Sequence, residues 1–243
     1  MASSTSAYVG QAYEKDARWI AVDHYTTSHL HPPTAPYHEA LERAAKLQTE
    51  RGLPDIAVPR AQGQFIALQC RLLNAKHVLE VGTLGGYSTI WLASTRPDIK
   101  VTTVEVNEQH AAVARESVDA AGVGDRVDII IGTGDEVLSR LRGEVASGTR
   151  PQFDFVFIDA DKEKNLAYLQ DSIPMSRKGA CIIVDNVVRR GTTADAEKAK
   201  TDSRVQGARA VIEGAGKDER IVAMVMQTVG EKNYDGFLMC AVK

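Results

Sequence analysis

The stretch Val78–Ser88, with the sequence VLEVGTLGGYS, joins an apolar run to a glycine-rich turn. An apolar run of this length is typical of a buried strand, and Ser88 stands where a helix would begin. Gly82, Gly85 and Gly86 allow the backbone to turn tightly and to approach a ligand closely. The stretch therefore predicts a strand, turn and helix of the kind found in nucleotide-binding α/β folds.

Seven strand-like apolar runs alternate with helix-like segments along the rest of the chain. They cover residues 77–82, 100–106, 126–132, 153–160, 180–186, 220–227 and 237–242. Such alternation indicates βαβ units, whereas the short polar turn before the last run predicts an antiparallel hairpin. We therefore expect an α/β, Rossmann-like, seven-stranded, mostly parallel sheet with helices on both faces and a C-terminal antiparallel hairpin.

A chain of 243 residues can bury a large core as a single domain. We expect one domain over residues 1–243, made of an N-terminal helical cap and a Rossmann-like core. The predicted parts are a cap over 1–58 with helices at 11–30 and 36–51, and a core over 59–243 whose first helix lies around 62–73.

Composition excludes several classes of partner. Charged residues make up 25% of the chain and the net charge is −3, so a nucleic-acid-binding surface is not expected. No apolar run reaches the length of a membrane span or of a signal peptide, and Ala2 replaces the glycine needed for myristoylation. Cys70, Cys181 and Cys240 are odd in number and lack CxxC spacing, which predicts reduced core cysteines and a cytoplasmic protein.

Two acidic residues, one inside the stretch VLEVGTLGGYS and one at the end of the next apolar run, are candidates for binding a nucleotide-like ligand. Glu105 ends the second apolar run, 23 residues after Gly82, where an acid in nucleotide-binding folds accepts hydrogen bonds from ribose hydroxyls. The alternative is a solvated glutamate at a strand end. Glu80 lies inside the first apolar run, where an unpaired carboxylate is costly, so we expect a positively charged or donor-rich partner. An amino-acid ammonium would serve, which favours S-adenosylmethionine over NAD.

Four oxygen-bearing side chains follow two later runs. Asp159, Asp161, Asp185 and Asn186 stand at the ends of runs expected to be neighbouring strands, and ligands of parallel sheets bind at that edge. Oxygen ligands without histidine or cysteine suit a hard divalent cation such as Mg²⁺. The alternative reading is that these acids only cap strand ends and turns.

Taken in order and spacing, EVGTLGGYS, VEVN, FVFIDADKEK and IIVDN resemble the cation-dependent class I O-methyltransferases, the family of caffeoyl-CoA and catechol O-methyltransferases. The resemblance runs from about Pro59 to Cys240. It implies methyl transfer to a hydroxyl of a catechol-type phenolic small molecule, and an enzyme that is a homodimer.

The resemblance also implies the roles of particular residues. It places a divalent cation, Mg²⁺ first and Ca²⁺ or Mn²⁺ as alternatives, on Asp159, Asp185 and Asn186. Lys162 would lie beside the acceptor hydroxyl and act in catalysis with Asp159, the alternative for Lys162 being a surface lysine. S-adenosylmethionine would be bound by Val58, Glu80, Gly82, Thr83, Ser88, Glu105, Gly134 and Asp159.

Two other functions share part of this pattern. An NAD-dependent dehydrogenase would have the glycine turn and Glu105, but it has no use for a metal-like Asp/Asp/Asn set. A non-catalytic S-adenosylmethionine-binding module would not need Lys162 or the three metal ligands. Methyl transfer therefore remains the leading hypothesis.

The segment after Asn186 bears on the acceptor. The plant enzymes of the family carry an aromatic residue where this chain has Arg189, and Ser203 and Ala208 stand where those enzymes have tyrosines for acyl-CoA. A dedicated CoA ester is therefore not expected. Arg189 and Arg190 could pair with a carboxylate on a catechol, the alternative being that both point to solvent.

Two further segments have more than one reading. Residues 192–204 are polar and suit a solvated loop or exposed helix, with a mobile lid as the alternative. His24, His29 and His31 could suggest a metal site, but their spacing favours surface or helix-capping roles.

Overall fold

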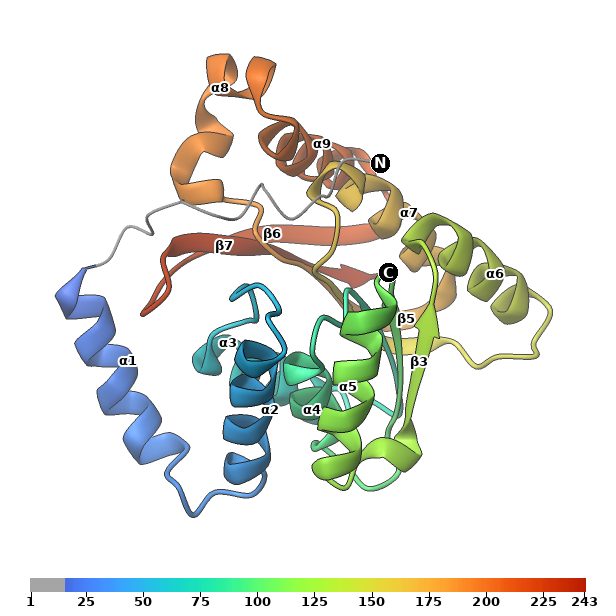
Figure 1. Cartoon of the computed structure of the whole chain (residues 1–243). Coiled ribbons are helices and arrows are strands. Elements are labelled where there is room, and N and C mark those ends of the chain that lie inside the picture. The colour runs from blue at the N-terminus through green and yellow to red at the C-terminus, as the bar shows by residue number, and fades with distance from the viewer. Residues whose placement is uncertain (1–15) are drawn as a thin grey trace.

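The structure, a computed structural model, describes residues 16–243 and contains one seven-stranded sheet in the order β3-β2-β1-β4-β5-β7-β6 (Figure 1). The strands are β1 (His77–Val81), β2 (Lys100–Glu105), β3 (Val127–Ile131), β4 (Phe153–Ile158), β5 (Ser176–Val184), β6 (Ile221–Val229) and β7 (Tyr234–Val242). β1 to β5 are parallel, while β7 runs antiparallel to both β5 and β6. The predicted sheet and its C-terminal hairpin are confirmed.

Helices cover the two faces of the parallel part. They are α1 (Ala17–Leu30), α2 (His38–Glu50), α3 (Arg60–Leu72), α4 (Tyr87–Ala93), α5 (Glu108–Ala120), α6 (Gly134–Ala146), α7 (Asn165–Met175), α8 (Ala196–Thr201) and α9 (Ser203–Lys217). α2 to α5 share one apolar core with the sheet, and α6, α7 and α9 share the other. Of the helix expected at 11–30, residues 11–15 lie outside the described residues. The division into a cap and a core stays a prediction.

The sheet edge at the carboxyl ends of β1, β4 and β5 is held together by backbone hydrogen bonds. The N–H of Asp159 donates to Val81 O at 2.8 Å, and the N–H of Asp185 donates to Ile158 O at 2.9 Å. The N–H of Gly82 donates to Val104 O at 2.9 Å. The residues that follow three neighbouring strands are therefore placed side by side at one edge.

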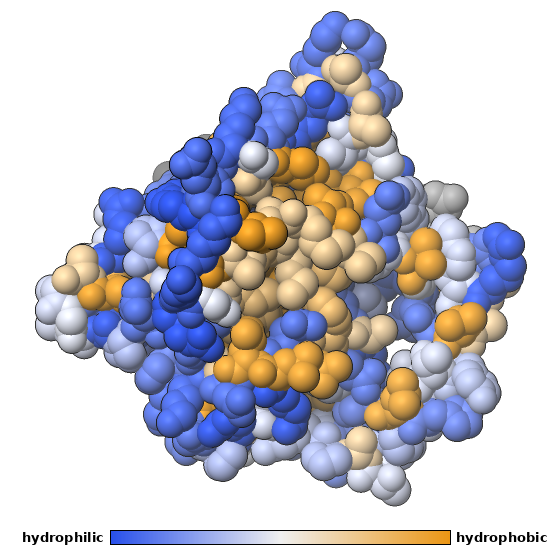
Figure 2. Space-filling model, turned by 180° about the vertical axis from the view of Figure 1, so that it is seen from behind, coloured by the Kyte–Doolittle hydropathy of each residue, from blue (hydrophilic) through white to orange (hydrophobic). Residues whose placement is uncertain are grey.

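The outer strand departs from the expectation of a sheet covered on both faces. β6 is mostly exposed, and its large apolar side chains Val222, Met224, Met226 and Val229 are between 47% and 63% exposed. Seen from behind, the surface carries a broad field of apolar residues across its middle (Figure 2). The cause is topological, because β6 is the last strand of the sheet and follows α9 without a further helix to cover it.

The turn between β6 and β7 is tied to the N-terminal part of the chain. Lys232 Nζ donates to Asp55 Oδ1 and to Ala57 O, both at 2.8 Å. The N–H of Glu231 donates to Asp23 Oδ2 at 2.7 Å, which joins the same turn to α1. We refer to these contacts as the hairpin clasp.

The surface and helix-capping roles expected for the three histidines are confirmed. His24 and His29 are exposed, but His31 is only 6% exposed and ends α1 as its C-cap. Its ring packs against Trp91 with the centroids 4.8 Å apart. The sequence did not reveal this packing partner, which lies 60 residues further along the chain.

The three cysteines are free and buried, as predicted. Among the helices described between residues 16 and 243, none has both the length and the apolar character needed to span a bilayer.

Candidate active site

A cavity of about 1540 Å³ opens at the carboxyl edge of the parallel strands. Ten of the predicted site residues line it: Val58, Gly82, Thr83, Ser88, Glu105, Gly134, Asp159, Lys162, Asp185 and Asn186. Glu80 has no exposed surface and lies behind the wall of the cavity. The structure thus gathers residues from helices, strands and loops that are distant in the sequence into one site.

Gly82 fits its position because nothing larger can. Its φ is +102°, and a Cβ there would lie 2.1 Å from the carbonyl oxygen of Asp159. The turn continues through Leu84, which adopts a left-handed φ of 49°, and through Gly86 with a φ of +84°. The backbone of the turn is therefore packed directly against the end of β4, and its surface toward the cavity is left without side chains at the glycines.

Glu105 holds the glycine turn as well as facing the cavity. Its Oε2 accepts a hydrogen bond from the N–H of Leu84 at 2.8 Å, and its Oε1 accepts one from the N–H of Asn107 at 2.9 Å. The residue is only 7% exposed. The alternative of a solvated strand-end glutamate is therefore wrong, and the carboxylate is oriented before any ligand binds.

Glu80 is a buried carboxylate that is only half satisfied. The hydroxyls of Thr89 and Thr103 donate to its Oε2 at 2.5 and 2.7 Å, whereas Oε1 has no hydrogen-bond partner among the described residues. Burial raises the pKa of Glu80 to about 7, although neighbouring hydroxyls, with that of Ser88 first, lower it. A donor is therefore missing on the side of Oε1.

The first residue of α6 brings backbone close to the same cavity. Gly134 begins the helix after the N-cap Thr133, and a Cβ on Gly134 would lie 2.6 Å from the ring of Tyr168. A helix N-terminus presents free N–H groups and a partial positive charge. The absence of a side chain at Gly134 therefore lets the ring of Tyr168 pack against the start of α6, where backbone N–H groups are free to bind a ligand.

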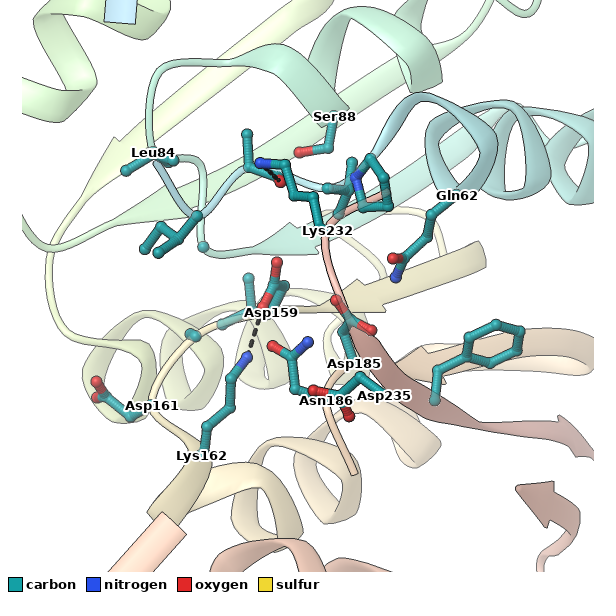
Figure 3. Close-up of a pocket in the computed structure, with 18 of the residues that line it drawn as sticks. Gln62, Leu84, Ser88, Asp159, Asp161, Lys162, Asp185, Asn186, Lys232 and Asp235 are labelled. Atoms are coloured by element: carbon teal, nitrogen blue, oxygen red, sulfur yellow. Dashed lines mark hydrogen bonds and ion pairs between the residues drawn. The ribbon is translucent and has the colours of Figure 1, made fainter. Parts of the chain in front are cut away.

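The predicted metal ligands lie together (Figure 3). Asp159 follows β4, while Asp185 and Asn186 follow β5, and the close-up shows the three side chains facing a common space. Asp161, in contrast, points away from them and accepts a hydrogen bond from the hydroxyl of Tyr168 at 3.3 Å. The structure therefore brings together three of the four predicted oxygen ligands and not the fourth.

The electrostatics of this group are unusual. Asp185 is only 5% exposed, and burial followed by repulsion from Asp159 raises its pKa. Lys162 Nζ contacts Asp159 Oδ1 at 2.5 Å. Burial alone would lower the pKa of Lys162, but the charges of Asp159 and Asp185 outweigh it and raise that pKa. The buried carboxylate of Asp185 and the half-buried carboxylate of Asp159 therefore share a site that favours positive charge.

Carboxylate, imidazole and thiol groups do not by themselves form a metal site in the described residues. Within residues 16–243, no group of three or more histidine, cysteine, aspartate or glutamate side chains is placed to hold a metal ion. The candidate set here consists of two carboxylates and the amide of Asn186, which adopts a left-handed φ of 58°. The amide oxygen would have to supply the third ligand.

Several residues that shape the site were not predicted. Gly207 of α9 lies against the backbone of Lys162, because a Cβ at Gly207 would be 2.0 Å from Lys162 O. Asp235 of β7 is 7% exposed and accepts hydrogen bonds from the N–H groups of Arg189 and Gly236, both at 2.9 Å. Close helix approach and a lone acid in the last strand have no distinctive sequence pattern.

The segment after Asn186 is partly helical. Residues Arg189–Ala194 form a 3-10 segment with left-handed φ angles at Arg189 and Arg190, and α8 follows. Arg189 lines the cavity, and its buried Nε has no hydrogen-bond partner among the described residues. The alternative that Arg189 points to solvent is therefore not supported. The lid hypothesis for 192–204 stays a prediction.

A Rossmann-like sheet that ends in an antiparallel hairpin, with a glycine turn after β1 and a buried acid at the end of β2, defines a methyltransferase-type fold. A family model described as O-methyltransferase matches residues 33–241. The chain belongs to this O-methyltransferase family, and it is an S-adenosylmethionine-dependent O-methyltransferase. The dehydrogenase and the non-catalytic module are therefore set aside.

Known proteins that match most of the chain support this assignment. The chain is 44% identical over 241 residues to O-methyltransferase imqG of Aspergillus flavus, covering 99% of this chain and 98% of that one. It is 42% identical over 206 residues to a catechol O-methyltransferase of Mycobacterium tuberculosis, covering 84% and 89%. The solved O-methyltransferase from Bacillus cereus in complex with SAH has a TM-score of 0.86 and 40% identity, covering 93% and 99%.

Proposed function

We propose that this protein transfers a methyl group from S-adenosylmethionine to a hydroxyl of a catechol-type phenol, with a divalent cation held by Asp159, Asp185 and Asn186. The observation that carries the proposal is the convergence of these three oxygen-bearing side chains beside Lys162 in the cavity (Figure 3). The similarity to the catechol O-methyltransferase of Mycobacterium tuberculosis supports the class of acceptor.

The residues fit S-adenosylmethionine, which supplies an electrophilic methyl group when bound. The orphaned Oε1 of Glu80 calls for a donor, and an ammonium reaching the glycine turn, directly or through a bridging water, would provide one. Glu105 presents an oriented carboxylate for ribose hydroxyls, and the α6 N-terminus at Gly134 adds backbone donors. Val58, Thr83 and Ser88 line the remaining wall.

The residues also fit a divalent cation. Two carboxylates and an amide form an all-oxygen set, which Mg²⁺, Mn²⁺ or Ca²⁺ prefers. Burial and repulsion from Asp159 raise the pKa of Asp185, and a nearby positive charge would favour its ionised form. A bound cation would lower the pKa of a phenolic hydroxyl and orient its oxygen toward the methyl donor.

Lys162 is suited to stabilise negative charge on the acceptor. Its pKa is raised, because the carboxylates outweigh burial, so its side chain is an ammonium at neutral pH. An ammonium can donate a hydrogen bond to a phenolate oxygen but cannot accept a proton from it. Gly207 fixes the backbone of Lys162 by its close approach, which holds the side chain over the cavity.

Metal dependence is tested by methyl transfer from labelled S-adenosylmethionine to a panel of catechols and matched monophenols. Excess EDTA is expected to abolish transfer to catechols, and added Mg²⁺ to restore it, because two adjacent hydroxyls chelate a cation whereas one does not. Full turnover in chelator would remove the metal from the proposal. Equal rates for catechols and monophenols would remove the vicinal-diol requirement while leaving methyl transfer intact.

Arg189 is expected to favour catechols that carry a carboxylate. Its buried, unpartnered Nε can form a charge-assisted hydrogen bond with an anionic substituent. The ratio of kcat/KM for 3,4-dihydroxybenzoic acid to that for its methyl ester should fall about 10-fold in Arg189→Met, the scale of one charge-assisted hydrogen bond. Arg190→Met, in the neighbouring position, is the matched comparison. An unchanged ratio in Arg189→Met would show that selection of the acceptor lies elsewhere.

We also propose a homodimer, supported by the exposed apolar strand β6 at the edge of the sheet. Light scattering should give twice the chain mass of 26.4 kDa. A single-chain mass at micromolar concentration would contradict this.

A cytoplasmic location is proposed from the three free, buried cysteines, which suit a reducing compartment.

A further inference from the structure

Gln62 is a buried amide at the edge of the proposed metal site that no sequence pattern indicated. It lies in the first turn of α3 and lines the cavity. Its Nε2 is buried and has no hydrogen-bond partner within donor–acceptor distance among the described residues. Leaving a buried amide donor unpaired is unfavourable, so such a group indicates a contact made in another state of the site.

The direction of the amide identifies that contact. Figure 3 shows Gln62 extending from α3 toward Asp185, on the side of the carboxylate away from Lys162. Gln62 and Asp185 line the same cavity. A small movement would therefore complete a hydrogen bond between Nε2 and one carboxylate oxygen, leaving the other oxygen for a ligand.

The helix that carries Gln62 is held firmly on both sides of this residue. A Cβ at Gly63 would lie 2.3 Å from Trp91 Nε1, so α3 packs directly on α4 at this point. Arg60, the first residue of α3, donates to His31 Nδ1 at 3.2 Å and to His38 Nδ1 at 3.0 Å. The backbone of Gln62 is thus fixed by the N-terminal part of the chain, and only its side chain is free to adjust.

We propose that Gln62 is a positioning residue whose Nε2 donates to the carboxylate of Asp185 and holds it in the orientation that serves a divalent cation. This inference rests on the proposed metal-dependent function. Hydrogen bonds to ligating carboxylates are a general means of orienting them, and their removal lowers metal affinity or activity about 10–100-fold. Gln62 acts through Asp185 and needs no contact with the acceptor.

The test measures Mn²⁺ binding by electron paramagnetic resonance without acceptor, so that it does not depend on turnover. Gln62→Met keeps the size of the side chain and removes the donor. Its Kd for Mn²⁺ should rise about 10–100-fold, while its Kd for S-adenosylhomocysteine by calorimetry stays unchanged. Gln64→Met is the matched control, because Gln64 lies on the same helix, does not line the cavity and donates to Leu30 O at 3.4 Å.

A second experiment tests whether Gln62 acts through Asp185. In a double-mutant cycle, adding Gln62→Met to Asp185→Ala should cause no further loss of Mn²⁺ affinity. An additive loss, or a single variant with wild-type Mn²⁺ affinity and a raised KM for catechol, would overturn the proposal in favour of direct contact with the acceptor. Equal losses of Mn²⁺ and S-adenosylhomocysteine affinity would show a merely structural role. A wild-type protein that binds no Mn²⁺ would instead refute the metal-dependent function itself.

Discussion

Asp185→Ala is expected to lower kcat for a catechol at least about 10³-fold, the largest effect on activity of any single change considered. A bound cation supplies several kcal/mol of charge stabilisation, and each ~1.4 kcal/mol corresponds to a tenfold change in rate. Asp185 is nearly fully buried, so no solvent-exposed group can replace its carboxylate. Affinity for S-adenosylhomocysteine, measured by calorimetry, should stay within about twofold.

Asp161→Ala provides the comparison for this experiment. Asp161 also follows β4, but its side chain points away from the proposed metal ligands and accepts a hydrogen bond from Tyr168 (Figure 3). Its removal should change kcat by no more than a few-fold. Comparable losses in both variants would contradict the distinction drawn between the two acids, and full activity in Asp185→Ala would contradict the ligand assignment.

Gly82→Ala is expected to have the largest effect on stability, at least about 3 kcal/mol. A positive φ costs a non-glycine residue about 1–3 kcal/mol, and here the new Cβ would also lie 2.1 Å from a backbone oxygen. Because this oxygen is the main-chain carbonyl of Asp159, no side-chain rotation can relieve the contact. The strands β1 and β4 would have to separate at their carboxyl ends. Urea unfolding measures the loss, and calorimetry should show weakened binding of S-adenosylhomocysteine.

Gly143→Ala is a control for the same chemical change at a harmless position. Gly143 lies inside α6, and a Cβ there would meet no atom within 4 Å. Alanine in a helix interior is about 0.5–1 kcal/mol more favourable than glycine, so this variant should be slightly more stable than the wild type. If Gly82→Ala unfolded at the same urea concentration as the wild type, the close contact with Asp159 would be wrong.

The sheet could be predicted from the sequence because its strands are continuous apolar runs separated by helical segments. The exposure of β6 could not, since IVAMVMQTV reads like a buried strand and only its place at the end of the sheet leaves it uncovered. In the same way, nothing around His31 indicates that its ring packs on Trp91. Contacts between segments distant in the chain depend on topology, which periodicity alone does not specify.

Site residues could be predicted from the sequence where burying the side chain without a partner would cost free energy. Glu80 stood out because a carboxylate inside an apolar run needs a partner, and the structure supplies Thr89 and Thr103 for one of its oxygens. Gln62 and Gly207 did not stand out, because an amide at a helix start and a glycine within a helix are ordinary in sequence. Their roles come from what lies opposite them in space, and that is visible only in the folded chain.

The hairpin clasp bears on how ligands exchange with the cavity. Lys232 and Glu231 join the β6–β7 turn to Asp55, Ala57 and α1 through one exposed ion pair and two part-buried hydrogen bonds. An exposed ion pair is worth at most about 1 kcal/mol and a hydrogen bond to a charged group about 1.5–3 kcal/mol, so releasing these three contacts costs less than opening the sheet. Separation of the turn from the N-terminal part would widen the opening of the cavity without moving Glu105 or the proposed metal ligands. We therefore expect the acceptor and its methylated product to enter and leave on the microsecond-to-millisecond scale of loop motions, while the sheet edge beneath them stays in place.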